Sequence, residues 1–339
     1  MSWDAMLVTR RDRGHSEGSW TKGWWALFLR HLEYLSALAR EGHFGRAAAA
    51  CWVSQPTLSD GIRKLEAEFG VAVVRRGHRF EGLTPEGERL LNWGRRLLAD
   101  RDQLMAEFGR TSHEGLTGHL RLGAVPASLP PVSLLTGPFR DRHPGTNLTV
   151  LSLTSDEILR RLTDFELDAG LTYLSGEPMA GFRTVPLYSE RYVLLTPENG
   201  DFAGRTEVGW AEAARLPLCL LTPDMQNRRI LDGLFHRAGV TVTPRMETNS
   251  VSTLCSHVRG GRWASVIPQA WLGLLGVPPG TRVLPLARPA ATSTVGLVIL
   301  DRDPPPLVVS ALVHVAEELD LQRSLDNLVP VDLTARFDG

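Results

Sequence analysis

The sequence predicts an α/β fold in which an N-terminal, all-α winged helix-turn-helix precedes a larger domain of interleaved strands and helices. Three observations lead to this prediction. Apolar residues recur at steps of three and four over 32–69, a short basic hairpin pattern follows at 71–83, and strand-like and helix-like segments alternate over 118–300. A chain of 339 residues is too long for one core, so two or three domains are expected.

Composition restricts the class of protein. Apolar residues at 43% and charged residues at 22% are typical of a soluble globular chain, and a net charge of −1 means that nucleic acid could be held only through a local basic patch. Cys51, Cys219 and Cys255 lack the number and spacing of a disulfide framework or a zinc site. We therefore expect no metal, no cofactor and a cytoplasmic location. No apolar run approaches the ~18 residues that span a membrane, so we expect no membrane partner.

A DNA-binding domain is predicted over 30–84, after an N-terminal tail at 1–29. The apolar periodicity predicts three helices joined by short turns, at 30–42, 44–51 and 55–69. The third helix is expected to direct an apolar stripe of Leu58, Ile62, Leu65 and Phe69 inward. Hydroxyl, amide and guanidinium groups lie on another side, which suits the major groove of DNA. The candidate DNA-contacting residues here are Ser54, which also caps the helix, and Gln55, Thr57, Ser59 and Arg63.

The hairpin at 71–83 is predicted to be a wing. Its tip carries Arg75, Arg76 and Arg79, which could neutralise phosphates beside the groove that the third helix reads. The alternative is a small packed bundle whose arginines form a solvated rim.

A long helix is predicted over 85–108, within a linker and dimerisation segment at 85–112. Thr84 and Pro85 form a typical helix start, and Leu90, Leu97 and Leu104 repeat every seven residues. This broad apolar stripe needs a partner helix, and the same helix of a second subunit is the simplest one. A homodimer or homotetramer on a two-fold site in double-stranded promoter DNA is therefore expected.

The runs FGRAAAACWVSQPTLSDGIRKLEAEFG and RRGHRFEGLTPEG resemble the N-terminal domain of LysR-type transcriptional regulators. The match spans about 32–108. It implies that Gln55, Thr57 and Ser59 lie in the groove and Arg63 near it. Asp60 departs from the family pattern, since that position is more often neutral or basic, and would either accept from a cytosine amino group or repel phosphate.

The remaining chain is predicted to be an effector-binding domain over 119–328, with a largely parallel sheet. Strands are expected at 118–125, 147–153, 169–173, 263–267 and 294–300, and helices at 129–142, 155–166, 227–238 and 250–259.

The family resemblance implies that this domain is similar to a periplasmic binding protein, with lobe one at 119–189 and 293–328 and lobe two at 190–292. Polar residues at helix starts would then line a cleft between the lobes and bind a small anion, most simply a carboxylate. The candidates are Ser128, Ser155, Tyr173, Thr222, Asn227, Arg228 and Asn249. The segments LCLLTPDMQNRRI and HLEYLSALAREGHFGRAA are also similar to a LysR-type subgroup associated with formate dehydrogenase genes, which implies formate as effector.

Two other classes of function remain open. One is a cytosolic α/β solute-binding protein or a non-regulatory ligand-binding protein. Such a protein would share the second domain but would not need a DNA-binding segment such as residues 31–83. An enzyme is not expected, because the sequence lacks a Gly-x-Ser-x-Gly elbow, a phosphate-binding loop and paired catalytic carboxylates.

Overall fold

The computed structural model describes residues 24–76, 80–108, 115–176, 179–287 and 292–328. The chain divides into two compact units, Met1–Asp102 and Gln103–Gly339, which we describe separately.

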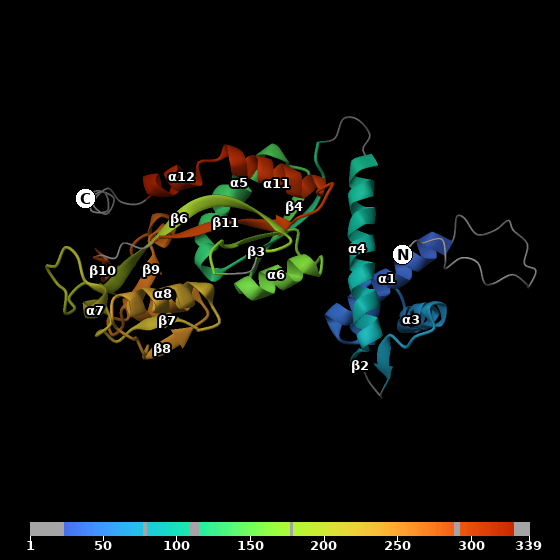
Figure 1. Ribbon diagram of the computed structural model, residues 1–339, viewed down its shortest axis with the longest axis horizontal. Helices are drawn as coiled ribbons and strands as arrows, with labels where there is room; N and C mark the ends of the chain where they lie inside the picture. The colour runs from blue at the N-terminus through green and yellow to red at the C-terminus, as the bar shows by residue number, and fades with distance from the viewer. Residues whose placement is uncertain (1–23, 77–79, 109–114, 177–178, 288–291, 329–339) are drawn as a thin grey trace, which may run out of the picture. The chain divides into compact units, whose positions relative to one another are not determined.

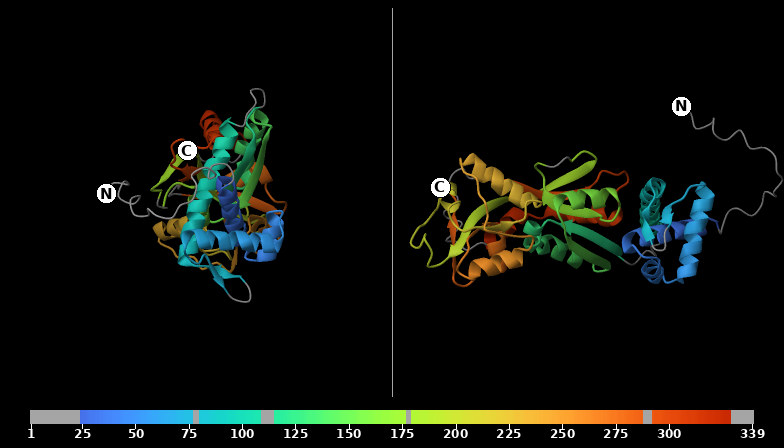
Figure 2. Two further views of the ribbon diagram at one scale, coloured as in Figure 1. Left: turned by 90° about the vertical axis from the view of Figure 1, so that its right-hand side faces the viewer. Right: turned by 90° about the horizontal axis from the view of Figure 1, so that it is seen from below.

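The first unit is a winged helix-turn-helix (Figure 2, left). Its elements are α1 (Trp24–Glu41), α2 (Phe44–Ala50), α3 (Gln55–Phe69), β1 (Val74–Arg76), β2 (Phe80–Leu83) and α4 (Pro85–Phe108), whose last turns belong to the second unit. Helix α1 begins at Trp24, earlier than the predicted start at Arg30, because the apolar run before Arg30 continues the helix.

Local capping sets the helix boundaries of this unit. The Nδ1 atom of His43 accepts from the backbone amide of Gly45 at 3.0 Å and starts α2. The Ser54 hydroxyl accepts from the amide of Thr57 at 3.3 Å and starts α3, and Gly70 ends α3 in the left-handed region at φ 66°. The wing packs tightly on α4, since a Cβ atom at Gly87 would lie 2.1 Å from the carbonyl oxygen of Val73.

The second unit is built on one mixed sheet with the order β10-β6-β11-β5-β3-β4, and β9 also pairs with β6. The strands are β3 (Gly118–Ala124), β4 (Thr146–Ser152), β5 (Ala169–Tyr173), β6 (Phe182–Pro197), β9 (Ser265–Pro268), β10 (Thr281–Pro285) and β11 (Thr292–Leu300). The expectation of a largely parallel sheet is wrong: β3, β4 and β5 are parallel, but β5–β11, β11–β6, β6–β9 and β6–β10 are antiparallel.

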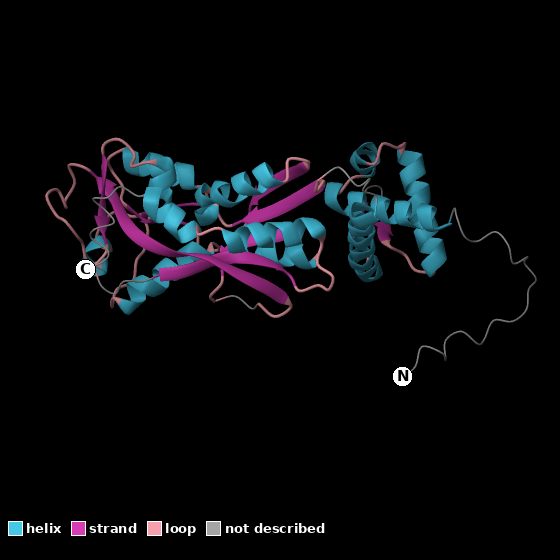
Figure 3. Cartoon of the chain, turned by 90° about the horizontal axis from the view of Figure 1, so that it is seen from above, coloured by secondary structure: helices cyan, strands magenta, loops and turns pink. Residues whose placement is uncertain are grey.

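The long strand β6 joins two lobes (Figure 3). Its first part, to Arg191, pairs with β11, and its last part, from Tyr192, pairs with β9 and β10. We therefore define the first lobe as 115–191 with 292–328 and the second lobe as 192–287. Sequence reasoning did not place a strand here, because β6 is buried on both faces along much of its length and lacks a regular alternation.

Helices cover both faces of the first-lobe sheet (Figure 1). One face carries α5 (Ser133–Arg142), α11 (Leu307–Glu318) and α12 (Leu321–Leu328), and the other carries α6 (Ser155–Thr163). The 3₁₀ turns η2 (Pro126–Ser128) and η3 (Pro130–Val132) follow β3. The second lobe adds α7 (Trp210–Ala213), β7 (Cys219–Leu221), α8 (Gln226–Arg237), β8 (Met246–Thr248), α9 (Val251–Arg259) and α10 (Ala270–Leu275).

Candidate functional site

Helix α3 presents a polar face. Leu58, Ile62 and Leu65 are buried, which holds the opposite side of the helix outward. The predicted residues Ser54, Gln55, Thr57 and Arg63 are exposed, and Ser59 is half-buried. Amide, hydroxyl and guanidinium groups along one exposed helix face can read base edges and phosphates.

Asp60, which departed from the family pattern, lies on the same helix. Its carboxylate pairs with the Nζ atom of Lys64 at 2.9 Å, one turn further on, and this hydrogen bond lowers the pKa of Asp60. The pair is exposed, so it adds little stability, but it offsets the negative charge that Asp60 would bring to DNA.

The wing strands are tied to α3 by Glu66, whose Oε1 atom accepts from the amides of Val73 at 3.0 Å and Val74 at 3.3 Å. Arg75 on β1 is exposed. The backbone of Arg76 belongs to β1, but its side chain and all of Arg79 lie outside the described residues.

The predicted effector residues near β5 are buried and bonded to one another. Tyr173 donates its hydroxyl to Oε2 of Glu190 at 2.5 Å and accepts from Nδ2 of Asn227 at 3.0 Å. Ser155 shares a hydrogen bond with Thr172 at 2.8 Å, and Ser128 accepts from the Tyr188 hydroxyl at 3.4 Å. These buried hydrogen-bonded groups make up a polar core.

Glu190 is the centre of this core and was missed by sequence reasoning. Burial raises its pKa from 4.5 to about 8, although the hydrogen bond from Tyr173 acts in the opposite direction. The carboxyl group is therefore protonated over most of the physiological range. The available signal in the sequence was a glutamate two positions before the apolar run at 192–195.

The start of α8 holds the second lobe against the first. Gln226 donates from Nε2 to the carbonyl oxygen of Ser175 at 3.2 Å, Asn227 reaches Tyr173, and an Arg229 nitrogen lies 4.0 Å from a carboxylate oxygen of Asp156. We call these three contacts the α8 latch. They occupy the side of the cleft where an anion was predicted.

Arg228 is directed into its own lobe. Its guanidinium donates to the Leu221 carbonyl at 2.8 Å, to Glu247 at 2.6 Å and to Asp232 at 2.9 Å, and the residue is only 6% exposed. These acceptors already compensate the Arg228 charge. Thr222 lies nearby in sequence, with a buried hydroxyl oxygen that has no hydrogen-bond partner among the described residues.

A cavity of about 680 Å³ lies between the lobes, bounded by the 3₁₀ turns of the first lobe and by α9 and α10 of the second. Most of its wall is apolar: Pro126, Leu129, Pro130, Leu195, Ile267, Trp271, Leu272 and Leu275. Asn249 is the predicted effector residue that lines it. The indole Nε1 atom of Trp271 donates to the Ala127 carbonyl at 2.7 Å and joins the two lobes at this point.

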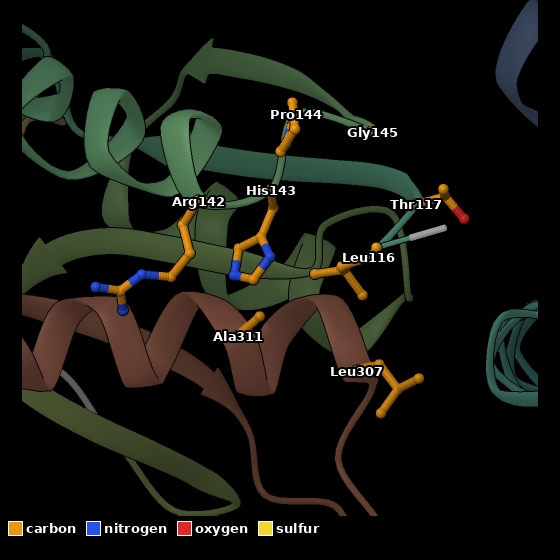
Figure 4. A pocket seen from close by; sticks show the side chains of 9 residues that line it. Leu116, Thr117, Arg142, His143, Pro144, Gly145, Leu307 and Ala311 are labelled. Carbon is orange, nitrogen blue, oxygen red and sulfur yellow. The ribbon is translucent and has the colours of Figure 1, made fainter. Parts of the chain in front are cut away.

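A second cavity, of about 610 Å³, lies in the first lobe between the end of α5 and α11 (Figure 4). His143 and Leu116 point toward the helix that carries Ala311. Arg142 at its edge pairs with Glu318 at 2.5 Å, so this cation already has an anionic partner. The cavity is separate from the junction of the lobes.

Among the described residues, no cluster of His, Cys, Asp and Glu side chains could hold a metal ion. No helix in the described part of the chain is long and apolar enough to cross a membrane.

Comparison with protein families gives two matches. The family model described as "LysR substrate binding domain" matches residues 113–320, and that described as "Bacterial regulatory helix-turn-helix protein, lysR family" matches residues 29–88.

Individual relatives agree with these matches. The chain is 32% identical over 284 residues to the DNA-binding transcriptional dual regulator OxyR of Escherichia coli (strain K12), covering 80% of this chain and 88% of that protein. It is 33% identical over 242 residues to a probable hydrogen peroxide-inducible genes activator of Mycobacterium avium, covering 70% and 77%.

Solved structures share the fold. A full-length OxyR variant from Pseudomonas aeruginosa superposes with a TM-score of 0.69 at 27% identity, covering 87% of this chain and 99% of that one. CbnR in complex with its target DNA gives a TM-score of 0.63 at 19% identity, covering 85% and 98%, and shows the fold alone.

Proposed function

This chain belongs to the LysR family of transcriptional regulators, and from that premise we propose that it binds a two-fold promoter site as a homo-oligomer under the control of a small anionic metabolite. It is a DNA-binding regulator with an effector-binding domain, as the sequence predicted. The LysR family consists of transcriptional regulators and not of enzymes, which confirms the expectation that this chain is not an enzyme. Its site of action is proposed to be the cytoplasm.

The exposed polar face of α3 is the observation that supports this function best. DNase footprinting of the full chain on its own promoter region should give a discrete site with two symmetric halves. Gln55→Ala and Arg63→Ala should each weaken binding to that site about tenfold or more, with a smaller effect on random DNA. Arg262→Ala, an exposed arginine in the second unit, is the matched control. Absence of any discrete site would contradict the proposal.

The homo-oligomer is supported by α4. Leu97 and Leu104, two of the heptad leucines, are exposed, whereas the third, Leu90, packs against the core of the first unit. Burying these leucines against a second copy of α4 would remove apolar surface from water. Leu97→Glu should shift the chain toward monomer in sedimentation velocity and reduce two-fold DNA binding. An unchanged sedimentation coefficient would exclude α4 as the contact.

The effector is proposed to be an anion, and resemblance to the formate dehydrogenase-associated subgroup makes formate the first compound to test. A thermal-shift series of carboxylates would identify the responsive member. The names of the OxyR relatives refer to hydrogen peroxide, so thiol oxidation is the competing signal. Burial raises the pKa of Cys219 to about 11 and also raises that of Cys255, which leaves little reactive thiolate. We therefore expect Cys219→Ser to retain the effector response.

A further inference from the structure

We propose that the cavity between the lobes binds a carboxylate with an apolar body, whose acid group pairs with Arg259. This inference rests on the proposed effector function and adds the class of ligand and the place where it binds. It keeps Asn249 from the cleft position predicted from the sequence but not Tyr173 and Asn227, which are bonded to each other beside the α8 latch.

The size and wall of the cavity define the body of the ligand. Clefts of roughly 300–1,000 Å³ enclose whole drug-sized molecules, and about 680 Å³ is available here. Formate would leave most of that volume empty. Leu129 and Pro130 come from the first lobe, and Ile267, Leu272 and Leu275 from the second, so an apolar body would contact both lobes at once.

The charges on the wall define the head group. Ser252, Cys255, Ser256 and Arg259 lie on the face of α9 that borders the cavity. Arg259 is exposed and forms no ion pair with another side chain in the described part of the chain, and no carboxylate side chain is among the described residues of the wall. A guanidinium without a counter-ion beside apolar surface favours a carboxylate over a neutral or cationic group.

The test is binding of phenylacetate and octanoate to the full chain, measured by thermal shift and isothermal calorimetry, with formate and the neutral phenylacetamide as comparison probes. We expect the two apolar acids to bind and the other two to bind at least tenfold more weakly. Arg259→Gln should weaken binding of the acids about tenfold or more, whereas Arg262→Gln, three residues further on, should have no effect. Leu275→Gln should weaken it too, and folding should survive because Leu275 is 60% exposed.

The position of the ligand can be tested independently through Cys255. Alkylation of this thiol by iodoacetamide, followed by peptide mass spectrometry, should slow in the presence of phenylacetate. Binding of formate alone, or binding that survives Arg259→Gln and leaves Cys255 alkylation unchanged, would overturn the inference. Neither result would change the DNase footprint of the chain on its promoter DNA. Absence of that footprint from the ligand-free protein would instead contradict the proposed function.

A different observation supports a second proposal, that Trp52 contacts the DNA backbone. Trp52 lies in the turn before α3, is 93% exposed and adopts φ 57°, a left-handed conformation that L side chains rarely take. The turn is fixed by hydrogen bonds from the amides of Trp52 to Ala49 and of Val53 to Ala48. A large apolar side chain held in water at a position suited to glycine has no structural benefit in the free protein.

The location of Trp52 indicates which part of the DNA it would contact. The N-terminal residues of a recognition helix enter the groove, so a side chain in the turn directly before α3 lies near the flanking phosphates. The indole N–H can donate to a phosphate oxygen. Contacts of this kind strengthen binding to every sequence rather than to one.

Trp52→Gly separates this role from a structural one. It should preserve or slightly raise the melting temperature, because the strain is relieved, and should weaken binding to specific and random DNA by the same factor, about five- to tenfold. Trp52→Phe, which retains the ring without the N–H group, should give an intermediate loss. Phe165→Gly is the matched control, since Phe165 also has φ 57° but lies in the second unit. Unchanged DNA affinity of Trp52→Gly would overturn the proposal.

Discussion

The two units use their polar side chains in opposite ways. In the first unit, Gln55, Thr57 and Arg63 stand exposed on one helix, with their hydrogen-bonding groups available to a partner. In the second unit, Tyr173 and Asn227 are buried and bonded to each other and to their neighbours. A surface carried by one element presents its polar groups to a ligand directly, whereas a cleft assembled from distant segments bonds several of its polar groups to one another.

The largest expected effect comes from the close approach of the wing to α4 in the first unit. Gly87→Ala places a Cβ atom 2.1 Å from the Val73 carbonyl oxygen, so we expect the winged domain to lose more than about 3 kcal/mol of unfolding free energy. The matched control is Gly137→Ala on α5, where nothing lies within 4 Å and the helix should gain about 0.5–1 kcal/mol. Urea denaturation measures the unfolding free energy of both variants. Equal values for Gly87→Ala and Gly137→Ala would contradict this prediction.

The protonated core of the second unit predicts a loss of stability with rising pH, centred on Glu190. Native Glu190 has a pKa of about 8 against 4.5 when exposed, so the folded state holds the extra proton between these values. Stability should therefore fall as pH rises from about 5 to 8, by up to about 1.4 kcal/mol per pH unit.

Denaturation of the wild type and Glu190→Gln at pH 5.5, 7 and 8.5 tests this. The glutamine variant accepts from Tyr173 without titrating and should show a flatter dependence. Parallel curves for the two proteins would mean that Glu190 is ionised in the folded state.

The hydrogen bonds around Tyr173 can be tested by removing its hydroxyl group. Tyr173→Phe leaves the Asn227 amide and a Glu190 oxygen without their partner and should cost about 1–3 kcal/mol of stability. Tyr188→Phe breaks a longer bond of 3.4 Å to Ser128 and should cost less. Thermal denaturation ranks the two variants, and the reverse order would place the centre of the network elsewhere.

The smallest expected effect on stability is at an exposed residue of the first unit. Arg75→Ala on the wing should leave stability within about 0.5 kcal/mol of the wild type. It should weaken binding to all DNA and lower the slope of log affinity against log salt by about 1, as expected for one lost phosphate contact. A change in sequence preference, seen with single-base variants of the site, would instead assign Arg75 to a base.

The same contrast explains which features the sequence predicts. Helix α3 was predicted to its exact ends because its stripe, its serine cap and its closing glycine are all local. The antiparallel pairing of β11 with β6 was not predicted, since it joins residues about a hundred positions apart. Internal neutralisation of Arg228 was likewise hidden, because its acceptor Glu247 is contributed by β8 rather than by the segment that carries the arginine.

Strand β6 determines how the lobes can move. One unbroken strand is paired with β11 up to Arg191, within the first lobe, and with β9 and β10 from Tyr192 on, within the second lobe, so these ladders meet at Arg191 but do not cross from one lobe to the other. Twisting about the strand axis preserves every rung. A rotation of one lobe about the strand axis at Arg191 would therefore be compatible with all the strand pairings of β6.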